Sequence, residues 1–438
     1  MVIIFIAASF ASAAFEPIGI WYLAILGFAL FFRKLRNSAK PIVHSLIFGL
    51  ILNAIVLHWT GKYVGALPWL LLASLQALFY IPIGWIYKRS HSIWWSALTL
   101  LIMEELRARV PFGGFGWTRI AFSQVDSPAL PIVSLGGVLA LSAFTVLVAT
   151  LLIKFTAKSM LIVAMVFIAT NFIPSNPQGS GSVRLLAVQG NTPSVGLHFN
   201  SRAKAVFNLH RDTTREFAQA TYDAIVWPEN AIDIDPRQFP EVAADITSLT
   251  TELQTPLIAG VVQRREGSPE NASIMYSKNG DRQSVYIKRG LTPFGEYMPL
   301  RKLAELVSPL ARNVNDFVSG DKRVVHKIAG AKVAPIICYE IIRDDLVRDM
   351  ALNSQALIVQ TNSATFANTA QSAQQLAITR IRAVEHSRYI LSVSTIGISA
   401  FIDNNGRVIS HTPEDIKSFL VGDLELNSNQ TFIDRLLG

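Results

Sequence analysis

The chain has 438 residues, of which 51% are hydrophobic and 16% are charged. Soluble domains usually carry about 25% charged residues, so this composition excludes a protein made of ordinary soluble domains throughout. The formal net charge is +8, but we find neither a basic stripe nor a nucleic-acid-binding motif, which argues against a nucleic-acid partner. Cys338 is the single cysteine, so an intrachain disulfide is excluded.

Residues 1–175 consist mostly of apolar runs, and we expect them to form a multi-helix transmembrane bundle. A helix that crosses a bilayer needs about 20 apolar residues, with a range of about 17–25. Several runs are near the lower limit, so the number of spans is open by one or two. The first two, separated by Glu16-Pro17, form either a broken helix or a hairpin. We expect about seven spans, at 2–15, 18–32, 41–57, 65–87, 92–106, 131–153 and 159–174.

Basic residues gather in the loops after the second, fourth and sixth predicted spans. These loops contain Arg33, Lys34, Arg36 and Lys40, then Lys88 and Arg89, then Lys154 and Lys158. The positive-inside rule places them in the cytoplasm, so the chain leaves the seventh span on the opposite face. We therefore expect a multi-pass protein of the bacterial inner membrane with a periplasmic C-terminal domain. Ala11-Ser12-Ala13 resembles a signal-peptide cleavage site, but the basic region that such a signal needs is absent.

Residues 183–425 read as one globular domain, followed by a short tail at 426–438. Strand-like runs alternate with amphipathic stretches, which predicts helices packed on sheets. We expect helices at about 200–220, 238–253, 341–351 and 369–386. We expect strands at 183–189, 224–227, 257–262, 273–277, 284–288, 333–337, 356–360, 389–394 and 400–402.

Three predicted strands end in polar motifs, and strand ends are where α/β folds usually build their sites. The motifs are Trp-Pro-Glu-Asn with Glu229, Lys-Arg-Gly-Leu-Thr-Pro-Phe-Gly-Glu-Tyr-Met-Pro with Lys288 and Glu296, and Cys-Tyr-Glu with Cys338 and Glu340. Taken singly, each acid or lysine is typical of a solvated turn. Together they supply the groups that thiol acyl transfer requires.

A cysteine thiol is a poor nucleophile until it loses its proton. Glu229 can accept that proton as a general base. Lys288 can favour the thiolate and donate to the oxyanion of a tetrahedral intermediate. A second carboxylate, either Glu296 or Glu340, can orient the lysine.

These motifs resemble those of the apolipoprotein N-acyltransferase family within the nitrilase, or carbon-nitrogen hydrolase, superfamily. The segments Phe-Glu-Pro-Ile-Gly-Ile-Trp ending at Trp21 and Gly-Phe-Gly-Trp ending at Trp117 are similar to stretches of that family. The resemblance implies a nitrilase-like αββα sandwich behind the transmembrane bundle. It implies that Glu229, Lys288 and Cys338 are catalytic, that Glu296 and Glu340 support them, and that Tyr339 shapes an acyl pocket.

The family's reaction would begin with attack of Cys338 on an acyl ester of a phospholipid. The resulting thioester would pass its acyl chain to the α-amine of a lipoprotein's diacylglyceryl-cysteine. The resemblance implies no metal and no organic cofactor. The partners would be a phospholipid donor, a lipoprotein or other amine acceptor and the membrane, and we expect a monomer.

Two departures from the family pattern leave alternatives open. The stretch at 362–367 lacks the expected Asp, aromatic and Gly, and the chain ends without the family's last transmembrane helix. The loop is expected to line the substrate entrance, which makes Asn362 and Phe366 candidate substrate-binding residues together with Trp117. The alternatives are a divergent conjugal-transfer or envelope relative with a different acceptor or a non-catalytic role, and a membrane-tethered amidase.

Overall fold

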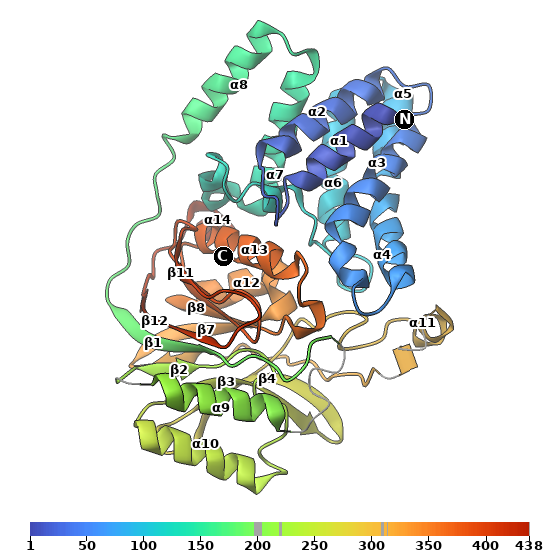
Figure 1. The fold of residues 1–438 in the computed structure, drawn as a ribbon. Coiled ribbons are helices and arrows are strands. Elements are labelled where there is room, and N and C mark those ends of the chain that lie inside the picture. Colours follow the sequence, from blue (N-terminus) through green and yellow to red (C-terminus); the bar gives the residue numbers. More distant parts are fainter. Residues whose placement is uncertain (197–203, 219–220, 308–310, 313, 438) are drawn as a thin grey trace. The chain divides into compact units, whose positions relative to one another are not determined.

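The computed structural model describes residues 1–437, except 197–203, 219–220, 308–310 and 313. The chain divides into two compact units. The first unit contains Met1–Ser175 and Thr431–Leu437, and the second contains Asn176–Gln430. Figure 1 shows helices in the first unit and two sheets flanked by helices in the second.

The helices of the first unit follow the apolar runs of the sequence. The fourth run is divided into two helices at Phe79 and Tyr80, and Pro41 starts the third helix at a position where its missing N–H costs little. The helices are α1 (Val2–Ala13), α2 (Tyr22–Arg36), α3 (Pro41–Val56), α4 (Ala66–Leu78), α5 (Ile81–Ser90), α6 (Ile93–Arg107), α7 (Val133–Leu151), α8 (Ala157–Thr170) and α14 (Phe432–Leu437).

Two stretches of the first unit are long and apolar enough to cross a membrane. They are Ala66–Ser90, with a mean hydropathy of 1.7, and Leu130–Lys154, with a mean hydropathy of 2.3. The helices Val2–Ala13, Pro41–Val56 and Ala157–Thr170 are apolar but shorter. The helical character of this unit is confirmed, whereas the expectation of about seven transmembrane spans stays a prediction.

Two six-stranded sheets, counted over the described residues, form the centre of the second unit. The first sheet has the order β12-β1-β2-β3-β4-β5, and the second has the order β11-β10-β9-β8-β7-β6. The first sheet contains β1 (Ser182–Gln189), β2 (Ala224–Val226), β3 (Leu257–Arg265), β4 (Ser268–Tyr276), β5 (Arg282–Ile287) and β12 (Ser418–Glu425). The second contains β6 (His326–Ile328), β7 (Ala331–Ile337), β8 (Ala356–Thr361), β9 (Tyr389–Ser394), β10 (Ala400–Ile402) and β11 (Val408–His411).

Each sheet has three parallel strands at its centre and antiparallel strands outside them. β1, β2 and β3 are parallel in the first sheet, as are β7, β8 and β9 in the second. The carboxyl ends of neighbouring parallel strands therefore meet at one edge of each sheet. This arrangement brings together segments that lie far apart in the sequence.

The second unit is an αββα sandwich, as expected. Apolar residues of both sheets, such as Leu185, Ile258, Ile358 and Leu391, share one buried core. The outer helices are α9 (Ala205–Phe217) and α10 (Pro240–Leu253) beside the first sheet, and α12 (Asp344–Leu352) and α13 (Gln371–Glu385) beside the second. Phe207 of α9 and Val242, Ile246 and Leu249 of α10 join a second core with the first sheet.

The predicted strands and helices of this unit are confirmed with shifts in their ends, the largest at β4, which begins at Ser268 instead of Ser273. Residues 200–203 and 219–220 of the first predicted helix lie outside the described residues. The strands β6, β11 and β12 and the helix α11 (Arg301–Val307) were not predicted. These elements are short or keep one face exposed, so they lack a strong apolar period.

Candidate active site

The candidate nucleophile lies at a sharp turn after a buried strand. β7 ends at Ile337, and Cys338 opens a short 3₁₀ helix, Cys338–Ile342. The backbone of Cys338 has φ of +49°, a left-handed conformation that residues with a β-carbon seldom adopt. Such conformations persist where the surroundings enforce them, and they gather at functional sites. The turn leaves Cys338 partly exposed between buried neighbours.

Glu229, Lys288 and Cys338 come together from three separate strand ends. Glu229 follows β2, and Lys288 follows β5. The Lys288 Nζ lies 3.2 Å from Glu229 Oε1, and both Glu229 and Lys288 are close enough to the Cys338 thiol to act on its pKa. Lys288 is 1% exposed and Glu229 is 5% exposed. The three predicted catalytic residues therefore form one cluster, in which Glu229 and Lys288 are buried and Cys338 is partly exposed.

Glu296 and Asn271 complete a closed ring of contacts around this cluster. Lys288 Nζ lies 2.8 Å from Glu296 Oε2. The Asn271 carboxamide nitrogen donates to Glu229 Oε1 at 2.6 Å and to Glu296 Oε1 at 2.9 Å. Glu296 Oε2 also accepts from the backbone N–H of Thr292 at 2.8 Å. Among the two carboxylates that could have oriented Lys288, the structure places Glu296 in direct contact with it.

Glu340 has a different position, beneath the loop that carries Lys288. Its Oε1 accepts from the Tyr286 hydroxyl at 2.8 Å and from the backbone N–H groups of Arg289 at 2.7 Å and Gly290 at 2.9 Å. Its Oε2 accepts from the backbone N–H of Ile337 at 2.8 Å. Glu340 therefore joins the lysine loop to the strand end that precedes the cysteine.

Burial and charge determine the protonation of the cluster. Burial and the Glu229 carboxylate raise the pKa of the Cys338 thiol, although Lys288 opposes them. Burial alone would lower the pKa of Lys288, but Glu229 and Glu296 outweigh it and hold that pKa well above its ordinary value. Burial raises the pKa of Glu296, but Lys288 and Asn271 reverse that effect and lower it overall. The resting site therefore holds a thiol, an ammonium and an ionised Glu296.

Residues of α13 hold the cysteine turn from behind. The fully buried Arg382 donates from Nε to the carbonyl of Ile341 at 2.9 Å, and from its guanidinium end to Asp344 at 2.6 Å. The Gln375 side chain donates to the carbonyl of Cys338 at 3.4 Å. Because charged and polar groups of α13 contact the turn at several points, the helix limits its freedom to move.

The other predicted site residues have separate surroundings. Tyr339 is 4% exposed, and burial raises its pKa. The Asn362 backbone N–H donates to Glu229 Oε2 at 2.9 Å, while its side-chain oxygen accepts from Ala364 and Thr395. Asn362 therefore contacts the general-base candidate through its backbone, and its side chain organises its own loop. Its role in substrate binding stays a prediction.

Trp117 belongs to the first unit, where it is 4% exposed. Its ring lies 4.9 Å from that of Trp59 and 6.3 Å from that of Phe115. These aromatic contacts stabilise the Gly-rich loop after α6. The predicted role of Trp117 in substrate binding stays a prediction.

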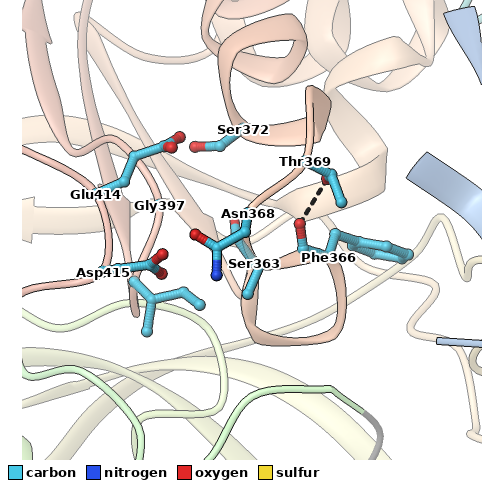
Figure 2. A pocket seen from close by; sticks show the side chains of 10 residues that line it. Ser363, Phe366, Asn368, Thr369, Ser372, Gly397, Glu414 and Asp415 are labelled. Carbon is cyan, nitrogen blue, oxygen red and sulfur yellow. Dashed lines mark hydrogen bonds between the residues drawn. The ribbon is translucent and has the colours of Figure 1, made fainter. Parts of the chain in front are cut away.

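A small pocket lies beside the loop that departs from the family pattern. Its empty volume is about 180 Å³, including space open to solvent. Figure 2 shows Glu414 and Asp415 on one side of it and Phe366 on the other. Burial raises the pKa of Glu414; a hydrogen bond from Ser372 opposes this effect, and Asp415 adds to it. The predicted substrate-entrance loop thus forms one wall of an acidic pocket, and the binding role of Phe366 stays a prediction.

Sequence reasoning missed Asn271 and the position of Arg382 behind the cysteine turn. Asn271 lies in β4 and is 1% exposed. A polar Glu270-Asn271 pair inside an apolar strand was the available signal, because buried polar side chains need partners. Within the described ranges, no group of three or more His, Cys, Asp or Glu side chains is placed to hold a metal ion.

Comparisons with known proteins cover both units. Residues 7–151 match the model of the apolipoprotein N-acyltransferase N-terminal domain, and residues 185–434 match that of carbon-nitrogen hydrolase. An apolipoprotein N-acyltransferase of Mycolicibacterium smegmatis is 31% identical, with 95% of this chain and 78% of the relative aligned. A protein of the same name from Shewanella oneidensis is 26% identical, with 100% of this chain and 92% of the relative aligned.

Solved structures of the nitrilase superfamily also align with part of the chain. A cysteine-to-alanine mutant of the Nesterenkonia AN1 amidase aligns with a TM-score of 0.44 at 16% sequence identity. The alignment covers 59% of this chain and 95% of the amidase.

Proposed function

The chain belongs to the apolipoprotein N-acyltransferase family of the carbon-nitrogen hydrolase superfamily, and on that premise we propose that it acylates lipoproteins. It moves a fatty acyl chain from a phospholipid, through a thioester on Cys338, to the α-amine of a diacylglyceryl-cysteine. The observation that carries this proposal is the cluster of Glu229, Lys288 and Cys338 in a chain of this family. Carbon-nitrogen hydrolase ancestry makes it an enzyme, and the names of its relatives point to N-acyl transfer.

The first half-reaction forms the thioester. Cys338 Sγ attacks the carbonyl carbon of a phospholipid ester while Glu229 accepts the thiol proton. Lys288 Nζ donates a hydrogen bond to the oxyanion of the tetrahedral intermediate. When the intermediate collapses, the carbon–oxygen bond of the ester breaks. The lysophospholipid oxygen leaves with the proton from Glu229.

The raised pKa of Cys338 supports proton transfer during the attack, rather than a thiolate formed beforehand. Glu229 lies close enough to the thiol to raise its pKa, which supports its role as the acceptor of the thiol proton. Lys288 keeps its charge because of the two carboxylates beside it. It can therefore stabilise negative charge on sulfur or on the ester oxygen throughout the step.

The second half-reaction uses the same groups in reverse. The amine nitrogen of the acceptor attacks the thioester carbonyl, and Glu229 accepts one of its protons. Collapse of the intermediate breaks the carbon–sulfur bond and returns the proton to Cys338. The product is an N-acylated lipoprotein and free enzyme.

Both substrates carry lipid chains, which gives a physical reason for joining this site to an apolar helical unit. We place the protein in the bacterial inner membrane as a multi-pass monomer, with the second unit on the periplasmic side. The two long apolar stretches, Ala66–Ser90 and Leu130–Lys154, support membrane insertion.

The proposal is tested by incubating purified protein in detergent with a phospholipid that carries a labelled acyl chain. We expect label on Cys338, removed by hydroxylamine, in the wild type and none in Cys338→Ala. Adding a diacylglyceryl-cysteine peptide should then discharge the label to the peptide amine.

Absence of label on folded wild-type protein, with the phospholipid intact, would exclude the phospholipid-donor mechanism. Label that is not discharged by the peptide would favour a different acceptor, as expected for a conjugal-transfer or envelope relative. Release of ammonia from amide substrates without acyl transfer would favour the amidase alternative.

A further inference from the structure

Asn271 contacts both carboxylates of the site although it belongs to none of the three strand-end motifs. It lies on β4, and its backbone carbonyl accepts from the N–H of Lys288 at 2.8 Å. The side chain is 1% exposed, so its polar atoms are shielded from water. This position places a neutral carboxamide beside the acids and the lysine of the cluster.

The two N–H groups of this carboxamide are each used by a different acid. The nitrogen donates to Glu229 Oε1 at 2.6 Å and to Glu296 Oε1 at 2.9 Å. The reverse orientation would set the carboxamide oxygen against two carboxylate oxygens, so the charge of the partners determines the orientation. The Asn271 oxygen has no hydrogen-bond partner among the described residues.

An unpartnered buried oxygen is costly, so folding alone gives little reason to keep a carboxamide here. We therefore relate the carboxamide to the balance of charge in the site. With a protonated thiol, Glu229, Glu296 and Lys288 sum to one negative charge. A cation at this position would weaken Glu229 as a base, and an apolar residue would remove one hydrogen-bond donor from each carboxylate. A neutral double donor gives each carboxylate a hydrogen bond without adding positive charge to the site.

We infer that Asn271 is a positioning residue that bridges Glu229 and Glu296 and holds the Glu229 carboxylate in place beside Cys338. This inference rests on the proposed function for the identity of the acyl donor. The bridge closes a ring in which Lys288 contacts the same two acids from the other side. Loss of the bridge should therefore affect deprotonation of the thiol more than substrate binding.

The test compares Asn271→Leu and Asn271→Asp with wild type in the pH dependence of single-turnover acylation of Cys338. Leucine has the same branching and the same number of side-chain heavy atoms but no donor, and aspartate adds a third acid. We expect both variants to lower the rate at neutral pH by about tenfold to a hundredfold. The acid limb of the profile should move upward by about one pH unit, because a carboxylate that loses a donor holds its proton more tightly.

Ser273→Ala is the matched control. Ser273 lies two residues away on β4, is fully buried and shares a hydrogen bond with His326 at 3.0 Å. The substitution removes a buried polar contact without changing the contacts among Glu229, Lys288, Glu296 and Asn271, so the acid limb should stay at its wild-type position. An acid limb unchanged in both Asn271 variants, or moved equally by Ser273→Ala, would overturn the inference.

Alkylation of Cys338 by iodoacetamide separates this inference from the proposed function. The alkylation rate reports activation of the thiol whatever the natural acyl donor is. If wild type forms no thioester but the Asn271 variants still shift the pH dependence of alkylation, the donor assignment fails and the bridge stands. If wild type forms the thioester and both profiles are unchanged in the variants, the bridge fails and the proposed function stands.

Discussion

The two units each bury a network of charged and polar side chains, and the networks differ in their charge balance. In the first unit Arg107, which is 2% exposed, donates to the Gln76 side chain at 3.2 Å and to Thr118. Its nearest acid is Glu104, at 3.7 Å. In the second unit Lys288 forms ion pairs with Glu229 and Glu296 and lies beside the Cys338 thiol. One network pairs a cation with one acid and neutral acceptors, and the other carries excess negative charge.

This difference distinguishes a structural network in the first unit from a reactive site in the second. An arginine keeps its charge under all ordinary conditions and fixes its partners through a rigid fork. Arg107 and Glu104 hold the loop after α6, since Glu104 also accepts from the backbone N–H of Ile120 at 2.9 Å. In the second unit the raised pKa of Cys338 keeps the thiol protonated at rest, and Glu229 and Lys288 are placed to accept its proton and to stabilise the charge that forms during attack.

Replacing Lys288 with methionine should produce the largest effect. The change removes the cation that opposes two carboxylates and stabilises the oxyanion, so we expect thioester formation to fall by about 10²- to 10³-fold. Single-turnover acylation of Cys338 measures the loss. Lys332→Met, at an exposed lysine of β7, is the control and should keep the wild-type rate. Equal rates for Lys288→Met and wild type would remove Lys288 from the mechanism.

Replacing Glu340 with alanine should reduce both stability and activity. Three backbone N–H groups and the Tyr286 hydroxyl would lose their acceptor. We expect a loss of about 3 kcal/mol in the free energy of unfolding, seen as a lower thermal midpoint. Glu252→Ala, at a half-exposed acid, should change the midpoint little. An unchanged midpoint in Glu340→Ala would contradict the linking role of this carboxylate.

Replacing Arg107 with methionine tests whether the first network is structural. The side chain has similar length, but Gln76 and Thr118 lose their donor, so we expect a loss of about 2 kcal/mol in stability. The pH profile of Cys338 acylation should keep its shape. Arg109→Met, at an exposed arginine, should change neither property. A displaced pH profile in Arg107→Met would show that the two networks are coupled.

The smallest effect near neutral pH should come from His326, a buried group that carries no charge. It accepts or donates hydrogen bonds with Ser273 and Ser284, and burial lowers its pKa to about 3 from 6.5. The unfolded chain takes up a proton below about pH 6.5, whereas the folded chain does not. Stability is therefore complete above that pH and falls by at most about 1.4 kcal/mol per pH unit as the pH drops toward 3.

Thermal midpoints between about pH 7 and pH 5 measure this effect. His326→Gln should lose part of the acid sensitivity, because glutamine can meet both serines without titrating. His411→Gln, at an exposed histidine, is the control and should keep the wild-type pH dependence. The same acid sensitivity in His326→Gln and wild type would assign it to other groups.

The sequence by itself determined the division into an apolar helical part and an α/β part, because hydrophobic runs and strand periods are local properties. It also pointed to Glu229, Lys288 and Cys338, since each stands in a polar motif at the end of an apolar strand. The strands β6, β11 and β12 could not be predicted from the sequence. Their pairing depends on neighbours far along the chain rather than on their own pattern.

Only the tertiary structure determined which group of the site each supporting residue contacts. Glu296 and Glu340 were equal candidates for orienting Lys288. In the folded chain Glu296 forms an ion pair with Lys288, whereas Glu340 accepts hydrogen bonds from the backbone of Arg289 and Gly290. The sequence did not indicate that Asn271 contacts two acids, because that contact depends on how β4 packs against the loops that carry Glu229 and Glu296. Motifs show which groups are present, but hydrogen-bond partners depend on distances between segments that the chain brings together when it folds.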